Sequence, residues 1–138
     1  MPDSSIDTEV ETWLRGVAAD LTEPLPRECL LCFVHRMLGA FGCRTTLRFA
    51  TRYRDLRAPR AVGLERRLGD RGGFCDCEIF INGWSAARHL WTPEVVAEHD
   101  GWVEVLEEAE PPSSMPGCLG ARLGSTQPCA LWERRRHR

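Results

Sequence analysis

The 138-residue chain has the length of a single domain, a formal net charge of −2 and seven cysteines. A domain of this size buries roughly two thirds of the surface that its unfolded chain exposes, so a metal is not needed to compensate for a small core. The longest apolar run, residues 30–34, is far too short for a signal or membrane-spanning segment. We therefore expect a cytoplasmic protein with no membrane contact, in which reduced thiols indicate metal or redox chemistry.

Helical periodicity dominates the first half of the chain. Residues 8–11 match a capping box, and the apolar residues after them recur at helical spacing. Three further segments show the same kind of pattern, and prolines or glycines separate them. The sequence predicts helices over 8–21, 27–41, 45–56 and from Pro59 to Gly72.

The pattern changes after the glycine pair at 72–73. Apolar and polar residues alternate over 75–82, which predicts a strand. A short helix is expected to start at 92–94, and residues 102–106 fit a second strand or more helix. We predict a mainly α fold with a small β element (α+β), a compact helical domain stapled by a cysteine metal cluster.

Composition suggests three parts. Prolines follow the first predicted helix, and an acidic run ends in a Pro-Pro-Ser-Ser segment with linker composition. We expect an N-terminal helix over 1–25, a cysteine-cluster domain over 26–112, and a linker with a basic tail over 113–138.

Two short cysteine pairs carry the chemistry. Cys29 and Cys32 lie in the first turn of a predicted helix, where residues three apart share a face. Cys75 and Cys77 lie on a predicted strand, which also places both side chains on one face. Zn–S bonds of about 2.3 Å require sulfurs within about 4 Å of each other, which two chelating pairs can supply. We predict a zinc site with these four ligands; an iron–sulfur cluster would use the same thiolates.

Two neighbouring residues are weighed against this site. Cys43 lies eleven residues beyond Cys32, which is roughly 16 Å along a continuous helix and too far to share an ion. It is interpreted as a small buried apolar residue. His35 lies three residues beyond Cys32 and can reach the same face, so it is a further candidate that replaces a thiolate or supports one.

These residues also carry a resemblance. The run Glu28-Cys-Leu-Leu-Cys, then Gly42-Cys43, the 46–48 stretch and Gly72-Gly-Phe-Cys-Asp-Cys-Glu78 resemble the bacterial family catalogued as domain of unknown function 2695. The resemblance covers about 26–83, and the C-D-C-E segment is its most specific part. It implies a compact domain with these cysteines as its signature and brings no activity or site roles.

Two cysteines lie near the C-terminus, outside the resemblance. Cys118 and Cys129 flank a loop that precedes the basic end of the chain. They fit a second half-site, a site shared across a dimer, or two incidental thiols in a mobile tail. The last interpretation is favoured.

The function expected from these features is non-catalytic. A closed four-thiolate site leaves no position for water or substrate, so we expect a metal-stapled protein-interaction module rather than an enzyme. The alternative is a thiol redox protein in which Cys29 is activated and Cys32 resolves it. The residues before Cys29 are broken by prolines and do not form the strand that a thioredoxin-like site requires.

Charge is arranged in blocks that bear on partners. Residues 44–71 are strongly basic and residues 89–117 strongly acidic, and every basic residue is arginine. An arginine stripe can follow a phosphate backbone, but the acidic block is able to neutralise it. We expect a protein partner or self-association, with at most weak nucleic-acid binding.

Overall fold

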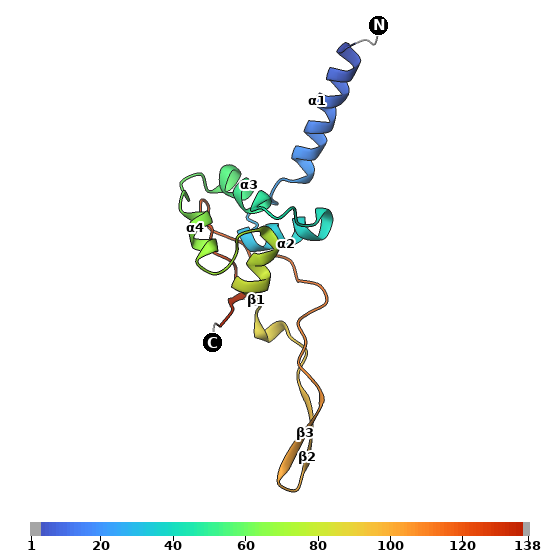
Figure 1. Ribbon diagram of the computed structural model, residues 1–138, viewed down its shortest axis with the longest axis vertical. Helices are drawn as coiled ribbons and strands as arrows, with labels where there is room; N and C mark the ends of the chain where they lie inside the picture. Colours follow the sequence, from blue (N-terminus) through green and yellow to red (C-terminus); the bar gives the residue numbers. More distant parts are fainter. Residues whose placement is uncertain (1–3, 137–138) are drawn as a thin grey trace.

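The computed structural model describes residues 4–136, and its shape is set by a central body with an extension at each end (Figure 1). Helix α1 (Ser4–Leu21) projects from one side of the body. A two-stranded hairpin of β2 (Val95–His99) and β3 (Trp102–Glu107) projects from the opposite side. The C-terminal segment returns to the body between them.

Helix α2 (Leu30–Phe41) lies in the centre of the hydrophobic core. Its first two turns are almost wholly apolar, and the ring of Phe33 is fully buried. That ring packs against the rings of Phe49 and Tyr53 on α3 (Arg48–Arg57), with centroids 6.4 and 5.8 Å apart. Helix α2 ends at Gly42, whose φ of 75° is strained for any residue with a side chain. The predicted helices in this region are confirmed.

The strand predicted over 75–82 is wrong, because this segment is helical. Helix α4 (Leu64–Gly69) is followed by α5 (Asp76–Glu78), which continues as a π-helix, η1 (Ile79–Gly83). The alternation of apolar and polar residues predicted that the Asp76 side chain faces outward, whereas it is fully buried. A buried carboxylate that binds the start of α3 fixes this segment more strongly than local strand preference does.

The two small sheets are both antiparallel pairs. Strand β1 (Trp84–Ala86) pairs with β4 (Trp132–Arg134), with Ser85 opposite Glu133. The β2–β3 hairpin is the other pair, so of the strand or further helix expected over 102–106 the structure has the strand. The helix expected from 92 is wrong: a 3-10 turn, η2 (Arg88–Leu90), comes earlier, and the chain then enters β2.

The fold class is therefore α+β, as predicted, with most of the regular structure helical. The segment expected as a linker and tail lies against the core, which includes Cys129, Leu131 and Trp132. The division into three parts stays a prediction, and His137 and Arg138 of the expected basic tail lie outside the described residues. None of the described helices is long and apolar enough to cross a membrane.

Candidate metal centre

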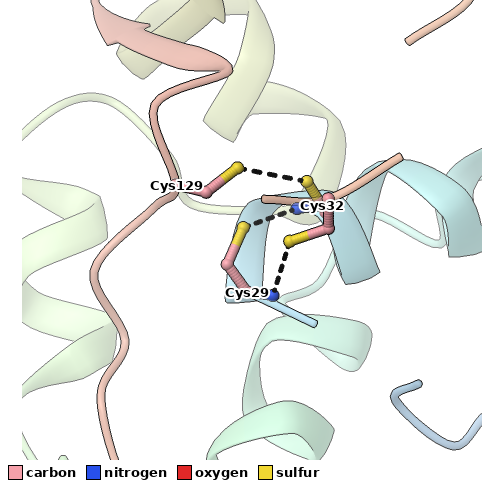
Figure 2. A group of neighbouring side chains, drawn as sticks. Cys29, Cys32 and Cys129 are labelled. Carbon is pink, nitrogen blue, oxygen red and sulfur yellow. Dashed lines mark hydrogen bonds between the residues drawn. The ribbon is translucent and has the colours of Figure 1, made fainter. Parts of the chain in front are cut away.

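Four cysteine sulfurs converge at the N-terminal end of α2. Each of Cys29, Cys32, Cys118 and Cys129 offers a sulfur within 4.8 Å of the other three. Figure 2 shows three of them, with the sulfurs of Cys32 and Cys129 separated by 3.7 Å. A tetrahedral ion with Zn–S bonds of about 2.3 Å places its sulfurs about 3.8 Å apart. The spacing therefore fits a four-thiolate metal site.

The C-x-x-C turn is shaped by the start of α2. Cys29 is the N-cap residue in extended conformation, and its sulfur accepts a hydrogen bond from the backbone N–H of Cys32 at 3.4 Å. A helix N-terminus has free N–H groups and a positive dipole end, and both favour a thiolate. The first half of the site is thus formed by the C-x-x-C turn at the start of α2.

The second half comes from the C-terminal segment. The sulfur of Cys118 accepts backbone N–H groups of Cys29 at 3.2 Å and Gly120 at 3.3 Å, so it is held to both halves of the site. The backbone N–H of Ala121 also donates to the carbonyl of Arg27 at 2.8 Å. These bonds dock residues 118–121 beside the C-x-x-C turn.

Trp132 connects β4 to the same cluster. Its indole N–H donates to the sulfur of Cys32 at 3.3 Å, and its ring lies in the core. Because β4 pairs with β1, the sheet fixes the position of Cys129 a few residues earlier. Hydrogen bonds to ligand sulfurs orient them and adjust their basicity, as outer partners do in known metal sites.

A partly buried ion pair supports the turn from the other side. The Glu28 side chain is buried, and both of its oxygens accept from Arg36, at 2.8 and 3.0 Å. The hydroxyl of Tyr53 donates to the carbonyl of Glu28 at 2.7 Å. These contacts fix the residue directly before Cys29, and so the direction from which its sulfur enters the site.

Burial and hydrogen bonding shift the thiol pKa values in opposite directions. The hydrogen bond from the Cys32 side chain lowers the pKa of Cys29 to about 5, with further backbone donors helping against burial. The same bond, together with burial, raises the pKa of Cys32. Burial raises the pKa of Cys129. Metal binding deprotonates thiols, so binding at this site releases protons and weakens in acid.

The structure divides the four predicted ligands between two groups. Cys29 and Cys32 lie in the cluster above, whereas Cys75 and Cys77 lie in a second group with Cys43. The interpretation of Cys43 as a small buried apolar residue is therefore corrected, because it is half-buried and its sulfur lies beside those of Cys75 and Cys77. It is not in the group that contains Cys32, as expected, although α2 ends before it and the two residues do not lie on one continuous helix. That the four predicted residues bind metal stays a prediction.

His35 is not a member of either group among the described residues. Its ring contacts the rings of Phe80 and Trp132, with centroids 5.7 and 5.4 Å apart. Burial by these neighbours lowers the pKa of His35 although the side chain is partly exposed. The histidine therefore packs on an aromatic group beside the cluster.

Cys118 and Cys129 are the residues that sequence reasoning set aside. The number of cysteines is the one feature of the sequence that could have indicated them, because a lone C-x-x-C pair needs two more donors to complete a tetrahedral site. Nothing in their own spacing identifies them as partners of a turn about a hundred residues away, 97 for Cys32 and Cys129. Their role depends on tertiary contacts.

The centre thus belongs to an α+β protein with a cysteine cluster that can hold a metal ion. The model of a family described as protein of unknown function (DUF2695) matches residues 30–82, which confirms the resemblance found in the sequence. The comparison with curated proteins and the comparison with solved structures each gave no match. The matched segment contains Cys32, Cys43, Cys75 and Cys77 and leaves out Cys29, Cys118 and Cys129.

Proposed function

We propose that the protein is a cytoplasmic zinc protein in which a structural ion is held by Cys29, Cys32, Cys118 and Cys129. The observation that carries the proposal is the convergence of four sulfurs from three separate segments within 4.8 Å. Four thiolates complete the coordination of zinc, so the ion has no open position and a catalytic role is not expected. The ion instead fastens the C-terminal segment to α2.

The four sulfur donors favour zinc or an iron–sulfur cluster over ions that prefer oxygen ligands. Soft thiolates in tetrahedral arrangement select zinc or iron–sulfur clusters. The two are separable by colour, because zinc is silent in visible light and an iron–sulfur cluster absorbs strongly. Protein purified without added metal should be colourless and carry zinc in this site.

The test is the metal content of single variants, measured by native mass spectrometry with elemental analysis. Cys118→Ser and Cys129→Ser should each lose the structural ion, and Cys43→Ser should keep it. Retention of the full ion content by both Cys118→Ser and Cys129→Ser would contradict the proposal. Circular dichroism of each variant separates loss of the ion from loss of the fold.

A thiol redox function of Cys29 and Cys32 is the main alternative. A low pKa at Cys29 suits either role, but reactive cysteines are partly exposed and Cys29 is fully buried. The rate of alkylation separates the two functions. Metal-loaded protein should react slowly at Cys29 at neutral pH and much faster after chelation, whereas a redox site reacts fast in both states.

A second copy of the chain is the partner that we propose for α1. Val10, Leu14, Val17 and Leu21 follow each other at spacings of four, three and four residues, which is the seam of a coiled coil. Leu14 is 52% exposed and the neighbouring Trp13 66% exposed. Helix α1 projects from the body (Figure 1), and Val10 and Leu21 are 50% and 56% exposed while Val17 is half-buried, so most of the stripe is accessible to a matching helix.

Sedimentation velocity tests this self-association. Leu14→Asp should shift the protein to the monomer, and Thr12→Asp, which adds the same charge away from the seam, should not. Wild-type protein that stays monomeric at high micromolar concentration would contradict the proposal. A heterologous partner would then be the remaining occupant.

Weak nucleic-acid binding is the alternative function. Contacts within the chain that occupy two arginines of the basic segment make it less favoured. Arg52 donates to the carbonyls of Thr22 and Ala19, at 2.9 and 3.2 Å, and Arg57 donates to that of Pro24 at 2.7 Å. These guanidinium groups hold the end of α1 in place. A filter-binding titration at two salt concentrations should show only weak, salt-sensitive binding.

A further inference from the structure

The second cysteine group lies on a different part of the body. Cys43 follows the glycine that ends α2, Cys75 is the N-cap residue of α5, and Cys77 lies within α5. The three sulfurs lie within 4.8 Å of one another, and those of Cys75 and Cys77 are 3.3 Å apart. All three residues fall inside the segment matched by the family model.

Contacts outside the sulfurs hold these residues in place. The Asp76 carboxylate is fully buried and accepts the backbone N–H groups of Phe49 and Ala50, at 2.9 and 3.1 Å. The backbone N–H of Asp76 donates to the carbonyl of Thr46 at 3.0 Å. The residue between the two cysteines is therefore tied to the segment that follows Cys43, so the three thiols are brought together by the fold itself.

The loop before Cys75 is also fixed. Gly72 has φ of 78°, and a Cβ atom there would lie 2.9 Å from the Cβ of Asn82. The Asn82 side chain donates to the carbonyl of Gly72 at 2.9 Å. Glycine is required at this position both by its backbone conformation and by the close approach of η1.

The electrostatics of the group suit thiolate ligands. Burial opposes ionisation of Cys43, but hydrogen bonds from the backbone and side chain of Cys77 lower its pKa overall. Burial raises the pKa of Cys75 to about 12, and hydrogen bonding with neighbouring side chains, including that of Glu78, adds to the shift. A metal ion that binds the group displaces the protons of these thiols.

We propose that Cys43, Cys75 and Cys77 form a second metal site, which binds a thiophilic divalent ion through three thiolates and leaves one coordination position open. Among the described residues, the group has three members and no fourth protein ligand. Water or a donor from another molecule completes the tetrahedron, as at zinc sites with three protein ligands. Three thiolates and one divalent ion give a net charge of −1, and the displaced protons pass to solvent.

The open position distinguishes this site from the four-thiolate centre. Cys75 is 6% exposed, but Cys43 and Cys77 are only half-buried, so small molecules can reach the ion. An ion with one exchangeable ligand is released faster to a chelator than an ion enclosed by four thiolates. The expected ligands of the open position are therefore small thiols, water or a side chain of a partner protein.

Zinc titration of the full chain, prepared reduced and metal-free, tests the proposal by native mass spectrometry. Wild-type protein should bind two ions, Cys43→Ser and Cys77→Ser one each, and Cys43→Ser/Cys129→Ser none. Cys129→Ser should keep the ion of the second site, so this proposal and the proposed function fail separately. The same count of ions in wild-type protein and in both single variants of the second site would overturn it.

Two further measurements make the test independent of folding. Chelator competition on wild-type protein should release one ion at least tenfold faster than the other, and Cys77→Ser should lack the fast phase. Peptide mapping of freshly purified, alkylated protein reports the state of Cys75 and Cys77. A disulfide between them, with no second ion bound after reduction, would overturn the proposal.

Discussion

The two cysteine clusters use the same residue type in different ways. The four-thiolate centre joins segments that are far apart in the chain, since Cys32 and Cys129 are 97 positions apart. The three-thiolate group lies within the family segment, where a buried carboxylate already brings its parts together. We infer from the comparison that one cluster closes the fold when it binds metal, whereas the other is presented by a segment that Asp76 already holds together.

The largest expected effect comes from breaking the cluster that closes the fold. Cys129→Ser should lower the free energy of unfolding by about 3 kcal/mol or more, a fall in Tm of roughly 6–12 °C, because a structural ion contributes its binding energy to folding. Cys77→Ser should lower the free energy of unfolding by less than half of this amount. Thermal and urea unfolding of the as-purified proteins measure both, and equal losses would remove the distinction between the clusters.

The next effect sharpens the comparison through Trp132. Trp132→Phe keeps an aromatic ring against Phe80 but removes the N–H that donates to Cys32. We expect metal release from the four-thiolate centre to become about tenfold faster or more, as for other outer hydrogen-bond partners. Trp91→Phe is the matched control, since the Trp91 N–H donates to the carbonyl of Ala86 instead. Equal release rates for the two variants would contradict the role of the Trp132 N–H group.

A third prediction concerns the carboxylate that organises the other cluster. Asp76→Asn offers one acceptor oxygen to two buried N–H groups of α3, so one donor is left unsatisfied. The free energy of unfolding should fall by about 1–2 kcal/mol. Asp100→Asn, the same change at an exposed residue, should have little effect. Urea unfolding compares the two variants. An unchanged free energy of unfolding in Asp76→Asn would show that this segment is held by other contacts.

The smallest expected effect is a pH dependence from His35. Its pKa in the folded protein is lowered by burial, so the unfolded chain binds the proton more readily. Stability is therefore complete above the ordinary histidine pKa of 6.5 and falls as the pH drops below it. His35→Gln should reduce this fall slightly, since the partly exposed ring is only partly desolvated. Urea unfolding of wild-type protein and His35→Gln at pH 7.5 and 6.0, with metal content checked at both, measures the difference. Equal losses of unfolding free energy in the two proteins would contradict the prediction.

Much of the helical fold could be predicted because its signals are local. The apolar period of α1 and α2 and the glycine after Phe41 act within a few residues, and the structure follows them. The segment after Gly73 was mispredicted because its conformation depends on Asp76 reaching α3. A buried polar residue that binds a distant helix has no signature in alternation, since its neighbours in the sequence do not reveal its partner.

The candidate site was only partly predictable for a similar reason. Spacing identified the C-x-x-C and C-x-C pairs as chelating units, but it could not say which unit would meet which of the remaining cysteines. That choice depends on the β1–β4 pairing, which places Cys129, and on the bond between Ala121 and Arg27. The first contact joins the end of the chain to residues 84–86, and the second joins residue 121 to the segment just before α2.

The projecting hairpin has a consequence for how copies of the protein behave together. Within the described chain β2 and β3 pair only with each other, so each strand presents one row of free N–H and C=O groups. Exposed Val103 and Val105 alternate there with acidic residues such as Glu104. Like charge on two approaching hairpins opposes edge-to-edge pairing, as in natural sheets that resist aggregation. The glutamates therefore oppose strand addition between molecules, and their replacement by glutamine removes this repulsion.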